Sequence, residues 1–189
     1  MKKMSTKDII AKTMLEFLEE KRVTQISVQD IAAEVGVSTR TFYNCFQDKY
    51  DVCNYIYDGI VKECLEPEGR RTTITGFFDN LMKDITGNYL QFFRNTLCYS
   101  GQNNLSEYIV RRGVCDLNDQ LRFTGHADMI SPENDMLLMV YMRGLASTLK
   151  MYFGSSKTTQ EQLMFFDKSE MLPRSLYKAL TDPVIEPAG

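Results

Sequence analysis

The sequence predicts an all-α protein, with a small helix-turn-helix unit at its N-terminus and a larger helical domain after it. Apolar residues recur at helical spacing through most of the 189 positions. Strand-like alternation of any length is absent from the sequence, and so are internal repeats. Gly36 interrupts two helical patterns at the offset that a tight turn between helices requires.

The first helix is expected to begin near Ser5 or Thr6, because either hydroxyl can cap it. Ser27 and Asp30 stand three residues apart, as in a capping box, and predict a short second helix that ends at Gly36. The inner face of the first helix carries apolar side chains at Ile9, Ile10, Met14, Phe17 and Leu18, with Thr13 among them.

Two further helix starts follow at once. Ser38 is a candidate N-cap for a third helix that runs to about Phe46. Asp48 caps a fourth helix, whose apolar positions continue to Cys64. Four helices therefore occupy the first 65 residues.

The second and third helices have the residue types of a helix-turn-helix. Gly36 tolerates the positive φ that the turn needs, and Ala32 offers a small side chain one helical turn earlier, where the next helix crosses. Apolar residues fall on the inner face on both sides of the turn, at Ile31, Val35, Val37 and Phe42.

The outer face of the third helix is polar and predicts contact with double-stranded DNA. Arg40 has the length and the bidentate fork to bind guanine O6 and N7 in the major groove. Thr39 and Thr41 carry short hydroxyl side chains that allow close approach to phosphates or base edges, and Tyr43 can offer its hydroxyl to a phosphate. Asn44 can contact either; its alternative role is to shield the helix end.

Two residues outside that helix complete the predicted contacts. Lys49, in the first turn of the fourth helix, is expected to clamp a phosphate together with backbone N–H groups, and Ser27 does the same at the second helix. A solvated lysine is the alternative at Lys49. Phe46 is assigned to the core with Phe42, whereas Cys45 either faces DNA or packs sideways.

The overall charge excludes a broad basic DNA-binding surface. The chain has a net charge of −3 and a pI near 5.3. Its first 65 residues hold nine basic and ten acidic side chains, which leaves that part at −1. Binding to DNA must therefore rest on a few placed groups and on helix N-termini.

Several other classes of protein are disfavoured. The N-terminus has no apolar signal region and no segment is long enough to span a membrane, so a cytoplasmic protein is expected. Five irregularly spaced cysteines and a single histidine, His126, predict reduced thiols and no metal site or cofactor. No catalytic residues are assigned, because no nucleophile, paired-acid or phosphate-loop pattern occurs.

The segment EPEGRR, at 66–71, marks the expected junction between domains. We predict a DNA-binding domain over 1–50, a connecting helix and junction over 51–69, and an effector-binding and dimerisation domain over 70–189. Within the last, helical patterns cover TITGFFDNLMKDI, GNYLQFFRNTL and LSEYIVRRGVCDLNDQLRF. Ser131 and Pro132 then open a helix to about Phe153. A final helical region covers about 158–180, with a break at Pro173 as an option.

The run IAAEVGVSTRTFYNCFQDKYDV resembles the DNA-binding signature of the TetR family of bacterial transcriptional regulators. The resemblance covers about residues 5–60 and departs from the family pattern at Cys45. It implies a three-helix head joined by a fourth helix to a variable helical domain, and DNA contacts at Ser27, Thr39, Arg40, Thr41, Tyr43 and Lys49. The end of the chain is similar to the subgroup that contains dihydroxyacetone kinase activators.

One recognition helix reads too few base pairs to select an operator, so we expect a homodimer on a palindrome. Apolar residues occupy more than one face of the 132–153 helix, which together with 158–180 predicts a four-helix bundle between subunits. A central helix of a monomer is the alternative.

The resemblance further implies a repressor that a small ligand releases from DNA. An apolar or aromatic effector is expected, because the aromatic and methionine side chains of the second domain offer few charges. The candidate lining residues are Phe77, Phe78, Tyr89, Phe92, Phe93, Tyr141 and Met142, although aromatic and methionine residues at helical spacing more often belong to a core. An activator or accessory factor that needs no effector and works through a protein partner is the alternative. A scaffold that uses the helix-turn-helix only for protein contacts is a more distant one.

Overall fold

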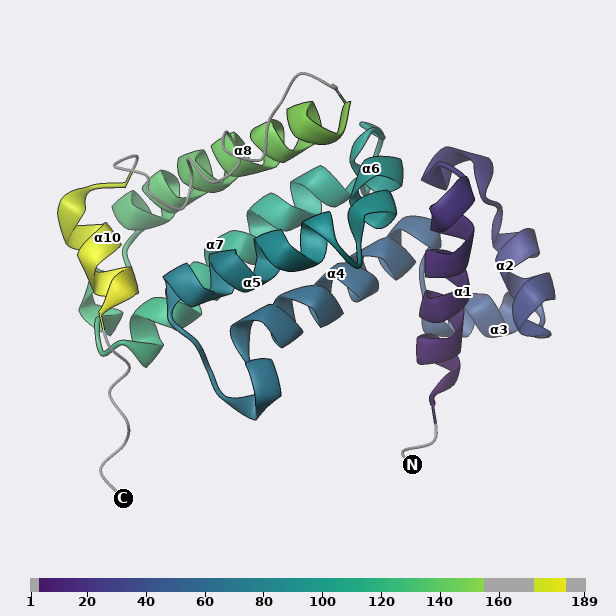
Figure 1. Cartoon of the computed structure of the whole chain (residues 1–189), viewed down its shortest axis with the longest axis horizontal. Helices are drawn as coiled ribbons and strands as arrows, with labels where there is room; N and C mark the ends of the chain where they lie inside the picture. The colour runs from purple at the N-terminus through teal and green to yellow at the C-terminus, as the bar shows by residue number, and fades with distance from the viewer. Residues whose placement is uncertain (1–3, 155–171, 183–189) are drawn as a thin grey trace.

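The computed structural model describes residues 4–154 and 172–182. Every regular element within these ranges is helical and none is a strand, which confirms the predicted all-α class. The molecule is elongated, with the first three helices gathered at one end and the later helices forming the rest (Figure 1).

Three helices form the N-terminal end, which we call the head: α1 (Thr6–Glu20), α2 (Val28–Val35) and α3 (Thr39–Cys45). A single 3-10 turn, Val23–Gln25, joins α1 to α2. The helices begin where capping residues predicted. The Ser5 hydroxyl accepts from the Asp8 N–H, and the Ser27 hydroxyl accepts from the Asp30 N–H, each in a reciprocal capping box.

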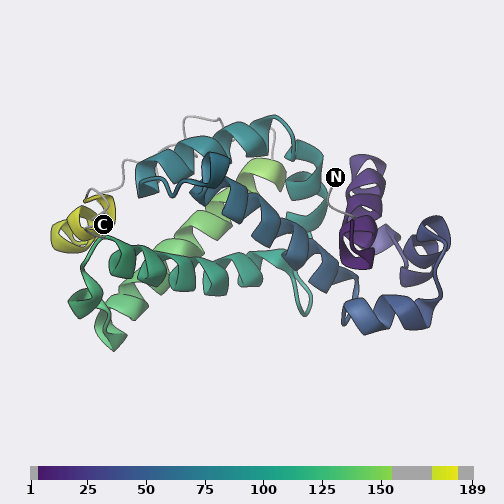
Figure 2. The ribbon, with the colours of Figure 1, turned by 90° about the horizontal axis from the view of Figure 1, so that it is seen from below.

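The fourth helix, α4 (Lys49–Leu65), connects the head to the rest of the chain. Its N-cap is Asp48, as predicted, and one carboxylate oxygen accepts from the backbone N–H groups of Tyr50 and Asp51 at 2.8 Å each. The helix packs against α1 of the head and against α5 and α7 of the remaining chain. A second view shows α4 running from the head along the longer helices (Figure 2).

The remaining helices form what we call the body. They are α5 (Ile74–Thr86), α6 (Leu90–Leu97), α7 (Leu105–Phe123), α8 (Pro132–Gly154) and α10 (Arg174–Thr181), with 3-10 turns at Pro67–Gly69 and Ala127–Met129. The two longest, α7 and α8, pack against each other, while α6 joins α8 to α1 and α10 lies against α5 and α7.

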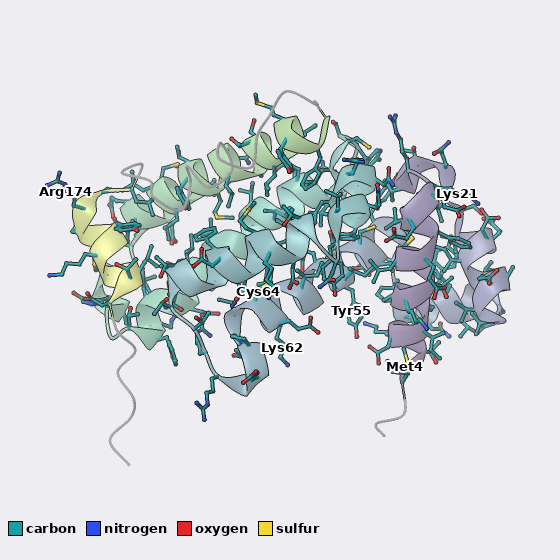
Figure 3. All side chains as sticks on the ribbon, viewed as in Figure 1. Met4, Lys21, Tyr55, Lys62, Cys64 and Arg174 are labelled. Carbon is teal, nitrogen blue, oxygen red and sulfur yellow. The ribbon has the colours of Figure 1, made fainter. Side chains whose placement is uncertain are left out.

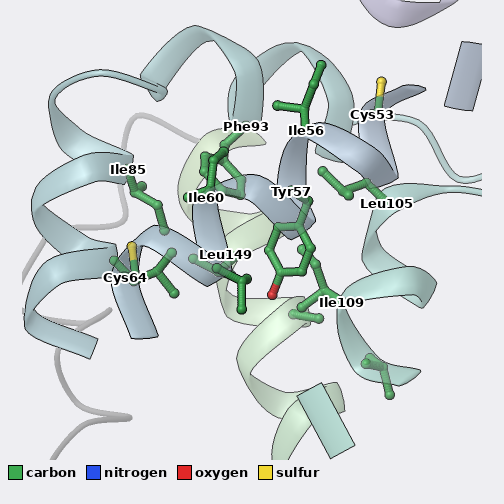
Figure 4. Packing of buried hydrophobic residues seen from close by; sticks show 14 of the residues in the cluster. Cys53, Ile56, Tyr57, Ile60, Cys64, Ile85, Phe93, Leu105, Ile109 and Leu149 are labelled. Atoms are coloured by element: carbon green, nitrogen blue, oxygen red, sulfur yellow. The ribbon is translucent and has the colours of Figure 1, made fainter. Parts of the chain in front are cut away.

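A hydrophobic core runs from the head through α4 into the body. Phe42, Phe92 and Phe93 are among its largest fully buried side chains. Figure 4 shows the part of this core around α4, where Tyr57 and Ile60 meet side chains of α5, α6, α7 and α8. Side chains of α4 belong to the core at both ends. A movement of α4 would therefore displace side chains in the head and in the body.

One long helix has two different faces. Leu138, Tyr141 and Leu145 of α8 are buried in the body, whereas Met136 and Val140 on the opposite face are about three-fifths exposed. The expectation that α8 carries apolar residues on more than one face is therefore met by one buried and one exposed side in this single chain. Most of the helical region expected at 158–180 lies outside the described residues. The part that is described, α10, begins directly after Pro173.

Candidate nucleic-acid interface

The turn between α2 and α3 has the geometry that its sequence predicts. Gly36 ends α2 in the left-handed conformation, with φ of 75°. Its N–H bonds to the Ala33 carbonyl, and the Val37 N–H donates to the Ala32 carbonyl at 2.9 Å. A β-carbon at position 36 would meet no atom within 4 Å, so the glycine is required for its backbone conformation and not for space.

The third helix begins with a cap that also orders one predicted contact residue. The Ser38 hydroxyl accepts from the Thr41 N–H at 3.1 Å and lies 2.9 Å from the Thr41 hydroxyl. Thr41 is half-buried, whereas Thr39 is exposed. The Thr41 hydroxyl therefore has an intramolecular partner, Ser38, that was not predicted from the sequence. A contact of this hydroxyl with DNA would have to coexist with its contact to Ser38.

The inner face of α3 fixes how the helix lies on the head. Phe42 and Phe46 are buried, as predicted, and their ring centroids are 6.0 Å apart. The Phe46 ring also meets Tyr55 of α4 edge-on at 5.6 Å, and Lys7 of α1 places its ammonium 5.2 Å from the Phe46 centroid. Aromatic contacts thus hold the C-terminal end of α3 against α1 and α4.

The outer face of α3 is free for a partner. Thr39, Arg40, Tyr43 and Asn44 are all exposed, and their spacing puts them on one side of the helix. Within residues 4–154 and 172–182, the Arg40 guanidinium makes no hydrogen bond or ion pair. Tyr43 is 57% exposed, and its ring meets Phe42 edge-on with 5.5 Å between the ring centroids. The structure therefore brings these four predicted residues together.

Ser27 forms the predicted capping box with Asp30, and these local hydrogen bonds compete with its predicted contact to a phosphate. Its hydroxyl donates to Asp30 Oδ2 at 2.6 Å and its N–H donates to the same oxygen at 3.0 Å. These two hydrogen bonds lower the pKa of the Asp30 carboxyl, so a negative charge stands beside Ser27. A phosphate at Ser27 would have to approach this carboxylate, and the backbone N–H groups of α2 are the better donors.

Lys49 lies half-buried between α4 and the start of α2. Its ammonium donates to the Ile26 carbonyl at 2.6 Å and to the Thr24 carbonyl at 3.4 Å. Burial lowers the pKa of this ammonium. Lys49 thus ties α4 to the segment that leads into α2, a role that the sequence analysis did not identify.

Cys45 is half-buried and packs against the core cluster. It ends α3 on the side of the helix next to Phe42 and Phe46. Sideways packing is therefore its observed position.

Besides the two bonds of Lys49, further hydrogen bonds tie the head and the start of α4 to the rest of the chain. Tyr55 of α4 donates to Asp8 of α1 at 2.7 Å, and the Asn95 amide of α6 donates to the Leu18 carbonyl of α1 at 2.8 Å. Asn103 donates to Asp48 at 2.9 Å. Figure 3 shows Tyr55 where α4 leaves the head, and Arg174 at the far end of the body.

The body contains a small apolar cavity of about 30 Å³ between α4, α5, α7 and α8. Of the predicted ligand residues, Phe77, Phe78, Phe93 and Met142 line it. Tyr141 lines a smaller neighbouring cavity with Phe78. The other two predicted residues lie elsewhere, because Tyr89 borders an open groove between α1 and α4 while Phe92 is packed in the core.

The cavity also has two polar lining residues that sequence reasoning missed, Tyr57 of α4 and Asp116 of α7. Burial raises the pKa of Asp116 to about 6, and Arg112 beside it opposes that shift. His126 lies away from the cavity, where its Nε2 is 2.8 Å from Asp182 Oδ2. In the described ranges no cluster of three or more metal-ligating side chains occurs. None of the described helices is long and apolar enough to span a membrane.

Comparison with known proteins finds a likeness in fold. No protein family and no curated sequence matches this chain. A solved structure described as the dihydroxyacetone kinase operon activator DhaS superposes with a TM-score of 0.56. The alignment covers 93% of this chain and 96% of that one, at 16% sequence identity. The two chains therefore share an all-α arrangement over nearly their full lengths.

Proposed function

We propose that this protein is a sequence-specific DNA-binding transcriptional regulator of the TetR type, which binds a palindromic operator as a homodimer. The observation that carries the proposal is the outer face of α3. Arg40 and its exposed neighbours stand on a short helix whose opposite face is fixed by buried phenylalanines, directly after a helix-turn-helix bend. A helix presented in this way fits the major groove, and a free guanidinium on it suits guanine.

The low net charge and the local hydrogen-bond donors support DNA binding through a small number of specific contacts. The first 65 residues carry a net charge of −1, so attraction at a distance is weak. Thr39, Tyr43 and Asn44 are then the residues that contact phosphates. Thr41 can add a contact while it keeps its hydrogen bond with Ser38. The N-terminal backbone of α2 and α4, next to Ser27 and Lys49, supplies further donors.

The exposed side of α8 supports the proposed homodimer. Met136, Val140 and Met151 are each about three-fifths exposed, and we call them the outer face of α8. Residues four apart on a helix share one side, so Met136 and Val140 form a continuous apolar strip. In the proposed dimer this strip packs on its symmetry mate, in a bundle to which the predicted 158–180 region also contributes.

For regulation, we propose that a ligand in the body cavity moves α4 and thereby releases the operator, which makes the protein a repressor. The support is that Tyr57 of α4 lines the cavity while Lys49 at the start of α4 holds the entry to α2. A second candidate is an activator that works through a protein partner. The printed description of DhaS as an operon activator favours it.

Selection of bound sites from random duplex DNA tests the proposal. We expect an enriched palindrome whose half-site centres lie one helical turn, about 34–36 Å, apart or a multiple of it. No enrichment, or enrichment of an asymmetric single site, would refute the dimeric operator reading. In vitro transcription from a promoter that carries the selected site then separates repression from activation.

A further inference from the structure

The body cavity combines aromatic walls with a single partly buried carboxylate. Its lining side chains are almost all apolar, and three of them are the phenylalanine rings of Phe77, Phe78 and Phe93. From α7 comes Asp116, whose side chain is 15% exposed. A carboxylate is an uncommon group in such surroundings, because its desolvation is costly unless a partner compensates for it.

Asp116 has only part of its bonding capacity satisfied by the described residues. Arg112, one helical turn earlier, places Nη2 3.0 Å from Asp116 Oδ1. The Arg112 Nε also lies 3.7 Å from Asp58 Oδ1, so one guanidinium serves two carboxylates. Tyr108 donates its hydroxyl to the other oxygen of Asp58 at 2.7 Å. Asp116 Oδ2 has no hydrogen-bond donor within the described ranges.

A second acceptor lies in the same cavity. Tyr57 is 5% exposed, and its ring meets Phe93 and Tyr108 edge-on at 6.5 and 6.2 Å. Figure 4 shows the Tyr57 hydroxyl directed between Ile109 and Leu149, both of which line the cavity. This hydroxyl makes no hydrogen bond to any described residue. Its oxygen can accept a hydrogen bond from a ligand.

We infer that the cavity takes a small lipophilic cation, an ammonium on an aromatic or branched apolar body, with the ammonium bound by Asp116 and the Tyr57 hydroxyl. The inference rests on the proposed ligand-responsive function and names the chemical class of its effector. It revises the expectation of an apolar or aromatic effector, because the Asp116 carboxylate adds a charged contact to the lining.

The local charge balance favours a cation over a neutral molecule or an anion. Within the ion-paired cluster, Asp58 and Asp116 carry two negative charges against one positive charge on Arg112. Arg71 acts on Asp116 more weakly and without an ion pair, because its Nε donates to Gln120 and its guanidinium lies over the Phe123 ring. α5 and α8 contribute only apolar side chains to the lining. A cation restores neutrality, and aromatic faces around it add cation–π attraction. A neutral ligand would leave the carboxylate desolvated, and an anion would meet two like charges.

The titration of Asp116 agrees with this balance. The groups that face Asp116 are Asp58 and Tyr57 of α4, Arg71 ahead of α5, and Arg112 and Asp119 of its own helix. Burial raises its pKa to about 6, with Asp58 and Asp119 adding to the rise and both arginines opposing it. A bound cation would stabilise the ionised form, so affinity is expected to rise as the pH rises from 5 to 7.

Methionine and glycine provide the room for a ligand. At about 30 Å³ the cavity holds roughly two water molecules as it stands. The Met142 side chain lies against Gly113 of α7, where an added β-carbon would come within 2.1 Å of the Met142 Cε. Because methionine is flexible, a ligand can displace this side chain and enlarge the space. Gly113→Ala would instead push Met142 into the cavity.

The test uses benzylammonium chloride and its neutral isostere benzyl alcohol, with binding measured by calorimetry on the full chain without DNA. Wild type is expected to bind benzylammonium at least tenfold more tightly than benzyl alcohol. Asp116→Asn should abolish that preference, and Asp79→Asn, the same change at an exposed position of α5 that does not line the cavity, should retain it. Tyr57→Phe should weaken benzylammonium binding severalfold and weaken benzyl alcohol binding by a smaller factor, because the alcohol donates only one, uncharged hydrogen bond.

A pH series on the wild-type protein provides a test that needs no substitution. Between pH 5 and pH 7 benzylammonium stays protonated while Asp116 titrates. Its affinity should rise about tenfold between pH 5 and pH 7, and that of benzyl alcohol should stay constant. Equal affinity for the two probes, no binding of either, or an unchanged preference in Asp116→Asn would overturn the inference. Since DNA is absent from these measurements, failure here leaves the DNA-binding proposal standing, and a failed operator selection leaves this inference standing.

Discussion

The side-chain amide of Asn103 donates a hydrogen bond to Asp48 Oδ2 at 2.9 Å, across 55 positions of the chain. Asp48 is the N-cap of α4, and its other oxygen holds the N–H groups of the first turn. Beside this bond, the rings of Tyr99 and Tyr50 stack at 4.5 Å with 5° between their planes. The loop between α6 and α7 therefore contacts the start of α4, where the head is attached, through this hydrogen bond and this ring stack.

Asn103→Asp should remove the hydrogen bond to Asp48 and weaken the contact between this loop and α4. The change keeps the side-chain shape and suits the left-handed backbone at this position, where φ is 57°. It replaces the donor with a carboxylate that faces Asp48, so we expect the free energy of unfolding at pH 7 to fall by about 1–2 kcal/mol. Chemical denaturation measures this. Gln102→Glu adds the same charge one residue earlier and should have little effect; equal effects would mean that the Asn103 hydrogen bond is unimportant.

Lys49→Met should destabilise the head. It removes a charged donor from the Ile26 and Thr24 carbonyls while keeping most of the apolar side chain. We expect a loss of about 1–2 kcal/mol in unfolding free energy, and weaker binding to all DNA sequences alike. If Lys49 also contacts a phosphate, the slope of log affinity against log salt should flatten by about 1. Lys62→Met, an exposed lysine further along α4 (Figure 3), is the control. A sequence-selective loss would contradict both roles.

Asp116→Asn should change how stability depends on pH. The pKa of Asp116 is about 6 in the folded protein, above the ordinary value of about 4 in an unfolded chain. As the pH rises from 4 to 6 the unfolded state loses its proton first, so wild type loses stability over that window. The variant lacks this loss and should gain on wild type by on the order of 1–2 kcal/mol, after allowance for solvent screening. A constant difference from pH 4 to 7 would exclude a raised pKa.

Val140→Glu should disrupt the proposed dimer. The substitution places a charge at the centre of the outer face of α8, where Val140 is 60% exposed in the single chain. A buried unpaired carboxylate would cost several kcal/mol in a subunit interface, whereas on a free surface it would cost little. Sedimentation should show a dimer for wild type and for Gln102→Glu, and a monomer for Val140→Glu. If the Val140→Glu variant remains a dimer, the interface between subunits does not include the outer face of α8.

Local chemistry explains why much of the head could be predicted from sequence. Ser27, Ser38 and Asp48 cap helices through bonds that reach only two or three residues, and Gly36 fixes a turn through its own φ. Such features are encoded within a few positions and do not depend on the rest of the fold. The same is true of Pro132, which opens α8 where expected.

The contacts that were missed join distant segments. The amine of Lys49 reaches carbonyls 23 and 25 residues earlier, and a carbonyl leaves no trace in a side-chain pattern. Asp116 and Tyr57 share a cavity although 59 positions separate them, and helical periodicity alone does not say which charged residue turns inward. Aromatic residues of the body were recognised as apolar, but their division between cavity and core depends on packing between α5, α6 and α8. Hence Phe93 lines the cavity and Phe92 does not.

The outer face of α3 is proposed to read DNA, and parallel site selections with wild type, Arg40→Ala and Arg174→Ala test this directly. Arg174 lies on α10, far from the head (Figure 3). Arg40→Ala should keep its fold, lose about 1–3 kcal/mol of operator affinity and lose the preference for guanine at one symmetric pair of positions. Arg174→Ala should select the wild-type site. If Arg40→Ala selects the same site with the same affinity and base preferences, α3 does not read DNA through Arg40, and the account is contradicted.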